Sequence, residues 1–255
     1  MESPQLTIIV PALNEEKRLA RSVGEALKAA SASQVECELI IVDDGSTDGT
    51  GAEANRLAAE NSRIRVIRLA RNLGLGGAYK AGLAAASGRY ITWVPADASH
   101  PADGLVTAYK AIGEADIIIP RPSNPEARGL GRRMISALYT KLVNAFNGLN
   151  VPYYNGLSVH RVELLRGITL RTDSFGFQAE VITRLLFRGA SYKVVDTYIT
   201  ERQLGHTKAF RPRNVLAVVR TLARILRLAL WQKLGGQART APPPGNKPAV
   251  PQSRK

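Results

Sequence analysis

The chain has a single cysteine among its 255 residues. Cys37 therefore cannot form an internal disulfide, and its place before an apolar run favours a buried core thiol over a nucleophile. No run approaches the roughly 18 uninterrupted apolar residues of a membrane span. The first ten residues lack the basic region and apolar run of a secretory leader. We therefore expect a cytoplasmic protein.

Acidic residues are scarce in the second half of the chain. Residues 121–255 hold 6 Asp and Glu against 23 Lys and Arg, whereas residues 1–120 hold 15 against 12. The formal net charge of +14 thus arises wholly from the second half. Such asymmetry favours an anionic partner: a nucleic acid, a phosphorylated substrate or an acidic membrane surface. Because the chain carries no recognised nucleic-acid motif, we expect no nucleic-acid partner.

Short apolar runs alternate with segments of helical periodicity over the first 200 residues. The runs predict strands over residues 6–10, 39–42, 64–69, 90–94, 116–119 and 193–199. Strands that alternate with helices of this length form right-handed βαβ units. We expect an α/β domain over residues 1–210, with a mostly parallel sheet flanked by helices.

The stretch LIIVDDGSTDGT, residues 39–50, is the most informative in the chain. Its apolar run is typical of a buried parallel strand, and it ends in Asp43, Asp44 and the turn-forming Gly45. Acids at this end of a strand lie on the edge where open α/β sheets bind ligands. The pair can accept hydrogen bonds from base N–H groups or ribose hydroxyls. The alternative is a capped βα turn with solvated acids.

Three glycines, Gly74, Gly76 and Gly77, precede an Ala-rich helix. A dinucleotide fingerprint would follow the first strand, whereas these glycines follow the third. We expect them instead to allow close backbone approach, with Arg71 and Lys80 facing a phosphate.

Three motifs at successive strand ends resemble the nucleotide-binding half of the GT-A glycosyltransferases of the large inverting family 2. They are PALNEE (11–16), IVDDGSTDG (41–49) and RNLGLGGAYKAGLAAASG (71–88). PADASHP (95–101) resembles dolichol-phosphate mannose synthases and other polyprenyl-phosphate glycosyltransferases, as do FQAE (177–180) and ERQLGHTK (201–208). The resemblance implies a GT-A fold with a nucleotide-sugar half over 1–120 and an acceptor half over 121–210. The implied donor-binding residues are Pro11, Ala12, Asn14, Glu15, Asp43, Asp44, Gly45, Arg71, Lys80, Ala96 and Asp97.

The fourth motif departs from the usual Asp-x-Asp of the family, because Pro95 replaces its first acid. The resemblance implies a divalent metal on the donor diphosphate, with Asp97 and Ser99 as ligands. One carboxylate can still bind Mg²⁺ or Mn²⁺, since such ions keep several waters and use substrate phosphates as ligands. We expect a weakened metal site, and a structural polar role for His100.

The acceptor half departs from the family as well. Tyr153 and Ser158 stand where relatives usually carry an Asp and an Arg. This difference indicates a different acceptor or a different mode of acceptor binding. Several basic residues could meet a lipid phosphate, and a solvated basic face is the alternative for the arginines on or before the helix that precedes Tyr153. The candidates are Arg121, Arg132, Arg133, Arg202 and Lys208.

Glu180 falls where the hydroxyl-transferring members of the family place their catalytic base. A phosphate acceptor needs no strong base, because a phosphomonoester is already largely dianionic at pH 7. Glu180 would then position metal, sugar or a basic side chain, or stabilise a helix dipole. In relatives the ERQLGHTK loop closes over phosphates, and positive charge there would neutralise the leaving diphosphate. The implied catalytic set is Asp97, Glu180, Arg202 and Lys208.

The C-terminal segment, residues 211–234, combines a broad apolar surface with a stripe of arginines. This pattern predicts an amphipathic helix or helix pair on an anionic membrane surface. Packing against the domain or a second subunit is the alternative. Residues 235–255 hold five prolines and little apolar content, which predicts a disordered basic tail.

The favoured function is an inverting glycosyltransferase at the cytoplasmic face of the membrane. It would move a sugar from a GDP- or UDP-linked donor to a polyprenyl phosphate, with a membrane protein or a second copy as a further partner. One alternative keeps the fold but uses a hydroxyl acceptor, either a glycan or another lipid. Another is a non-catalytic basic protein that binds nucleotide or membrane, which Pro95 favours.

Overall fold

The computed structural model describes residues 4–124, 129–173 and 176–198, and four helical positions further on, 220, 223, 226 and 227. The predictions for Arg202, Lys208, the tail and most of residues 211–234 lie outside this part of the chain. So does the side chain of Arg132. None of the described helices is both long enough and apolar enough to cross a membrane.

Within the described residues, seven strands form one sheet in the order β3-β2-β1-β4-β6-β5-β7. Of these seven, only β6 is antiparallel to its neighbours, so the sheet is mostly parallel, as the alternating pattern predicts. The strands are β1 (Leu6–Ala12), β2 (Cys37–Asp43), β3 (Ile64–Arg68), β4 (Tyr90–Trp93), β5 (Ile117–Pro122), β6 (Val159–Arg161) and β7 (Tyr192–Thr197).

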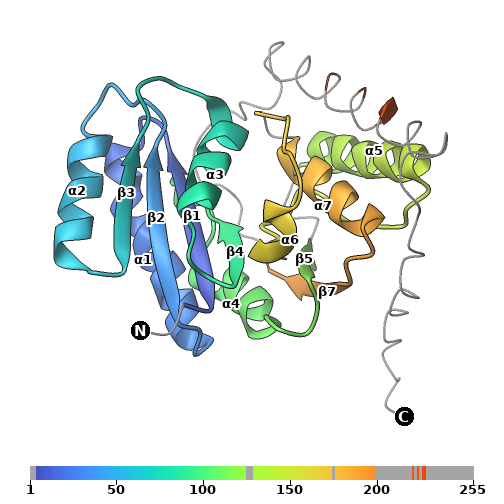
Figure 1. Ribbon diagram of the computed structural model, residues 1–255, viewed down its shortest axis with the longest axis horizontal. Coiled ribbons are helices and arrows are strands. Elements are labelled where there is room, and N and C mark those ends of the chain that lie inside the picture. The colour runs from blue at the N-terminus through green and yellow to red at the C-terminus, as the bar shows by residue number, and fades with distance from the viewer. Residues whose placement is uncertain are drawn as a thin grey trace.

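Helices cover both faces of the sheet (Figure 1). They are α1 (Glu16–Ala32), α2 (Thr50–Glu60), α3 (Gly74–Ala85), α4 (Ala102–Lys110), α5 (Leu130–Asn147), α6 (Val162–Arg166) and α7 (Phe177–Phe187). Side chains of α1, α2 and α4 pack in one apolar core, and those of α3, α5, α6 and α7 pack in the other. Alternate residues of the strands supply both cores: Ile8 of β1 faces the first and Ile9 the second. Fully burying each such side chain contributes about 1.5–3 kcal/mol.

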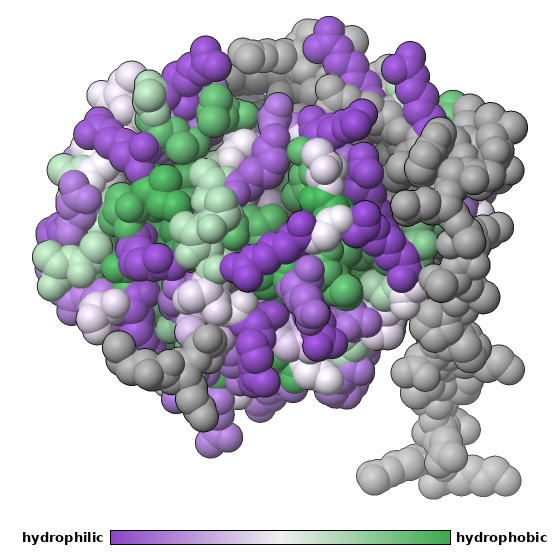
Figure 2. Space-filling view, viewed as in Figure 1, coloured by the Kyte–Doolittle hydropathy of each residue, from purple (hydrophilic) through white to green (hydrophobic). Residues whose placement is uncertain are grey.

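The pairing of β1 with β2 fixes the geometry of the ligand-binding edge. The two strands run parallel in register from Leu6 opposite Cys37 to Ala12 opposite Asp43. Both therefore end at the same level, at the upper edge of the sheet in Figure 1. Cys37 is buried, as expected. Hydrophilic and hydrophobic side chains are interspersed on the face shown in Figure 2, so hydropathy alone does not mark a binding surface there.

The sequence interpretation missed β6 and α6. Val159 and His160 of β6 are fully buried between β4 and β5. The strand spans three residues and has only two paired positions with each neighbour, so its own apolar pattern is too short to predict it. By reversing direction there, the chain places the segment before β6 at the same edge of the sheet as the end of β4.

Candidate functional site

The acidic pair at the end of β2 is buried rather than solvated. Asp43 is fully buried, and its Oδ1 accepts a hydrogen bond from the Ser46 amide at 2.9 Å. Its Oδ2 lies 3.5 Å from Arg68 Nε and has no hydrogen bond among the described residues. The Asp43 carboxylate therefore shapes the turn that follows β2.

Asp44 connects this turn to the start of α3. Its two carboxylate oxygens accept hydrogen bonds from the Leu73 amide at 2.7 Å and the Gly74 amide at 2.9 Å. Burial raises the pKa of Asp44, the two amides oppose that shift, and neighbouring Asp43 adds to it. A carboxylate at a helix amino terminus meets unsatisfied N–H groups and the positive end of the helix dipole.

The first and second motifs interlock. Asn14 adopts a left-handed conformation with φ 56°, which asparagine tolerates better than most residues. Its side-chain oxygen accepts a hydrogen bond from the backbone amide of Thr47 at 2.9 Å, and its backbone amide donates to Ser46 Oγ at 3.0 Å. The Glu15 amide donates to Thr50 Oγ1 at 2.9 Å. These contacts hold Asn14 and Glu15 beside the acidic pair, as the resemblance implies.

The third motif meets the second at Gly45. This glycine has φ 74°, and a Cβ there would lie 2.8 Å from the Arg71 carbonyl carbon. The Arg71 backbone therefore passes directly over the turn, while its side chain is exposed. Lys80 was expected to face a phosphate, but in this structure it forms an ion pair with Asp173 of the acceptor half.

Asp97 lies in the loop after β4, on the same edge of the sheet. Its Oδ1 accepts a hydrogen bond from the Ser99 amide at 3.1 Å, across Ala98 at φ 55°. The Pro95 carbonyl accepts a hydrogen bond from Ser22 at 2.7 Å, so Pro95 contributes a structural contact here. Within the described ranges, no group of three or more His, Cys, Asp and Glu could hold a metal ion. One carboxylate with a nearby hydroxyl fits only a metal that draws its other ligands from water and the donor diphosphate.

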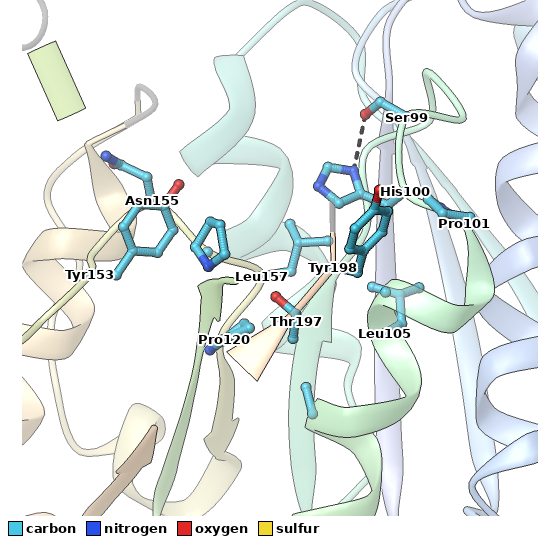
Figure 3. Close-up of a pocket in the computed structure, with 14 residues that line it drawn as sticks. Ser99, His100, Pro101, Leu105, Pro120, Tyr153, Asn155, Leu157, Thr197 and Tyr198 are labelled. Carbon is cyan, nitrogen blue, oxygen red and sulfur yellow. Dashed lines mark hydrogen bonds between the residues drawn. The ribbon is translucent and has the colours of Figure 1, made fainter. Parts of the chain in front are cut away.

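A pocket adjoins this loop (Figure 3). Ser99 and His100 line it from the β4 side, joined by a 3.0 Å hydrogen bond between Ser99 Oγ and His100 Nδ1. Tyr153 and Tyr198 line it from the acceptor half. None of the 14 residues that line it is Asp, Glu, Lys or Arg. Its lining is therefore mainly apolar and neutral polar, with His100 as the side chain able to carry a positive charge.

The other acceptor candidates do not converge on this pocket in the described structure. Arg121, at the end of β5, pairs with Asp196 at 2.7 Å. Arg133 is exposed on the first turn of α5. Ser158, which replaces the arginine of relatives, is fully buried, so it is a core position here rather than part of a binding surface.

Comparison with known proteins gives the family. Residues 7–163 match the family model described as glycosyl transferase family 2. The chain belongs to this family. It is therefore a glycosyltransferase with a GT-A fold.

Two relatives align with most of this glycosyltransferase. Undecaprenyl-phosphate mannosyltransferase of Micrococcus luteus is 30% identical over 213 residues, 78% of this chain and 85% of the relative. Polyprenol monophosphomannose synthase of Mycolicibacterium smegmatis is 32% identical over 217 residues, 79% of each chain.

Among solved structures, glucosyl-3-phosphoglycerate synthase of Mycobacterium tuberculosis superposes with a TM-score of 0.63. It is 23% identical, and the match covers 88% of this chain and 80% of that one, so it supports the fold alone. The same enzyme has been crystallised with Mg²⁺ and UDP.

Glu180 of this glycosyltransferase lies in a closed network rather than in an open site. Its Oε1 accepts from Arg184 Nε at 2.8 Å, and its Oε2 accepts from the Thr172 amide at 2.9 Å. The Arg171 amide lies 3.2 and 3.3 Å from the two oxygens. The side chain is almost fully buried. Its catalytic role remains a prediction, and the described geometry gives it structural partners.

Sequence reasoning missed Thr172, Asp173 and Arg184 as members of the site. The four-residue spacing of Glu180 and Arg184 on one helix is a signal that would have found that ion pair. Thr172 contributes a backbone amide and Asp173 a backbone carbonyl, and such backbone contacts leave no residue preference in the sequence. Asp173 also pairs with Lys80 through its side chain, but the two residues are too far apart in the chain for their spacing to reveal the pair.

Proposed function

We propose that this glycosyltransferase moves one sugar from a nucleotide diphosphate sugar to a polyprenyl phosphate, with inversion, at the cytoplasmic face of the membrane. One observation carries the proposal. Polar motifs gather at the carboxyl ends of β1, β2 and β4, in a chain about one-third identical to two transferases named for polyprenyl-phosphate mannose synthesis. This edge of an open α/β sheet is where such folds bind ligands.

The donor nucleoside would bind at the turn formed by the first two motifs. Asn14, Glu15 and the turn after Asp43 are held together by the hydrogen bonds described above, so this surface is preorganised. Preorganisation lowers the cost of ordering side chains on binding. The resemblance favours a GDP- or UDP-linked donor.

Asp97 and Ser99 would hold Mg²⁺ or Mn²⁺ together with the donor diphosphate. When bound, the ion would supply positive charge for the leaving diphosphate. The residues of this chain would orient the donor: Asp97 is fixed by the Ser99 amide, and the pocket beside it is lined by no Asp, Glu, Lys or Arg. Arg202 and Lys208 are proposed to add positive charge from the loop that follows β7.

The acceptor phosphate would attack the anomeric carbon from the side opposite the leaving diphosphate. It needs no protein base, because a phosphomonoester is already largely dianionic at neutral pH. Glu180 agrees with this, since both of its oxygens already accept hydrogen bonds and the side chain is buried. Arg121, Arg132 and Arg133 are proposed to guide the phosphate, and the pocket lined by Tyr153 and Tyr198 to receive the sugar or the first isoprene unit.

The exposed face of α5 supports a location at the membrane. Leu130, Met134, Ile135 and Leu138 are between 53% and 69% exposed, and their spacing places them along one side of the helix. Apolar side chains on a helix that also carries basic residues are typical of segments lying in a membrane interface.

Purified protein incubated with polyprenyl phosphate and radiolabelled GDP- or UDP-sugars tests the proposal. We expect one donor to transfer label to the organic phase, and Asp97→Asn to slow transfer by about a hundredfold. Asp103→Asn is the matched control, because this substitution makes the same chemical change nearby and Asp103 is exposed on the first turn of α4. Label on a soluble or glycan acceptor, with none in the organic phase, would overturn the acceptor assignment.

A further inference from the structure

We propose that Glu180 is a positioning residue that holds the donor site together from the acceptor side. It fixes residues 171–173, termed the bridging segment, against the amino end of α3, whose other side is held by Asp44. The inference rests on the proposed function, because the donor site that it supports is the one proposed above.

The first link joins Glu180 to the bridging segment. Two successive backbone amides, those of Arg171 and Thr172, point at one carboxylate. Arg184, one turn further along α7, donates to the same carboxylate and fixes its orientation. Hydrogen bonds to an ionised acceptor are roughly twice as strong as neutral ones. Thr172 is itself buried, so loss of this acceptor would leave its N–H group without water to replace it.

The second link joins the bridging segment to α3. The Gly76 amide donates to the Asp173 carbonyl at 2.9 Å. A Cβ on Gly76 would lie 2.3 Å from the Thr172 carbonyl oxygen, and a Cβ on Gly74 would lie 2.6 Å from that of Asp173. Only glycine permits this approach. Figure 1 shows the segment ahead of α7 reaching the upper end of α3, and Lys80 adds its ion pair with Asp173.

The third link joins α3 to the nucleotide turn. Asp44 accepts hydrogen bonds from the amides of Leu73 and Gly74, at the same end of α3 that the bridging segment contacts. The amino end of α3 is thus clamped between two carboxylate-anchored elements. Asp44 anchors it to the nucleotide half and Glu180 to the acceptor half. If the Glu180 link is lost, the bridging segment is no longer anchored to α7, and its contacts with this end of α3 lose that support.

Glu180→Gln breaks the first link with little change in volume. The amide group of Gln has one acceptor oxygen with two lone pairs, and its NH₂ group would face N–H donors, so at most two of the three donors could still be satisfied. Hydrogen exchange should speed up at Thr172 and Gly76, and the dissociation constant for UDP or GDP should rise about tenfold. The KM for the sugar donor should rise likewise, with kcat at saturating donor largely retained. Loss of a general base would instead lower kcat on the order of a hundredfold or more.

Glu163→Gln is the matched control, because this substitution makes the same chemical change and Glu163 is exposed on α6 of the same half. It should leave exchange, affinity and kinetics unchanged. Gly76→Ala disrupts the contact between α3 and the bridging segment from the α3 side. This variant is tested in place of Glu180→Gln if Glu180→Gln does not fold. Normal nucleotide affinity and normal exchange at Gly76 in folded Glu180→Gln would overturn the inference, as would a large fall in kcat alone. Wild-type protein that binds neither UDP nor GDP would instead contradict the proposed function. The hydrogen-exchange rates at Thr172 and Gly76 would still test the link between Glu180 and α3.

Discussion

Acidification should destabilise this glycosyltransferase through His160. This histidine lies in β6, paired with Ile91 of β4 and Ile117 of β5, and is fully buried. Neither ring nitrogen has a hydrogen-bond partner among the described residues. Burial lowers the pKa of His160 to about 3, because the charged imidazolium would lose its hydration there.

The direction and size of the effect follow from the two pKa values. In the unfolded chain the histidine takes up a proton near pH 6.5, whereas in the folded protein it stays neutral down to about 3. The neutral side chain therefore favours folding fully above pH 6.5, and this contribution is lost as the pH falls toward 3. Between pH 7 and pH 5 the free energy of unfolding should fall by about 2 kcal/mol from His160 alone.

Urea unfolding of wild type and His160→Leu at both pH values isolates this contribution. Leucine has a similar volume, does not titrate and leaves no polar nitrogen in the core. Other groups that titrate between pH 7 and pH 5 contribute equally to both proteins. We expect the variant to lose about 2 kcal/mol less stability than wild type over this interval. Equal losses in the two proteins would refute the reasoning.

Three further predictions concern other parts of the molecule. Burial opposes ionisation of Glu38, but hydrogen bonds from a threonine hydroxyl and a backbone amide lower its pKa. In urea unfolding at pH 7, Glu38→Gln should therefore lower the free energy of unfolding by about 1–3 kcal/mol. The difference between the two proteins should shrink as the pH falls below about 4.5. Gly76→Ala should lower the free energy of unfolding by about 1–3 kcal/mol, whereas Gly24→Ala, where nothing lies within 4 Å, should raise it by about 0.5–1 kcal/mol. Replacing Met134 and Leu138 by Ser should weaken flotation with anionic liposomes, and unchanged flotation would show that α5 does not face the bilayer.

The long strands and the edge of the sheet at which β1 and β2 end could be predicted because their signals are local. The β-branched runs of β1 and β2 are buried on both faces, and such strands appear as continuous apolar runs. The change from apolar residues to Asp43, Asp44 and Gly45 marks the point where β2 ends. The position of these acids at the carboxyl edge of the sheet therefore follows from sequence and the rules for open α/β sheets.

The partners of these side chains could not be predicted, because they are distant backbone groups. Asp44 binds amides that lie 29 and 30 residues further along the chain. The bridging segment meets Gly76 across almost 100 residues. The glycines of α3 indicate that some backbone segment approaches there. A backbone N–H or carbonyl is present at nearly every position, so the sequence does not show which segment this is. The buried state of Asp43 and Ser158 likewise depends on packing around them.

Two of the basic residues expected to meet phosphates, Lys80 and Arg121, are already paired with carboxylates in this structure. Lys80 contacts Asp173, and Arg121 contacts Asp196. All four side chains are at least 36% exposed, and exposed ion pairs contribute at most about 1 kcal/mol. A phosphate carries more charge than one carboxylate, so it can displace either aspartate at little cost. If Lys80 and Arg121 bind phosphate as proposed, the two aspartates would hold these cations in place before substrate binds, and the proposed site need not be preformed with unpaired positive charge.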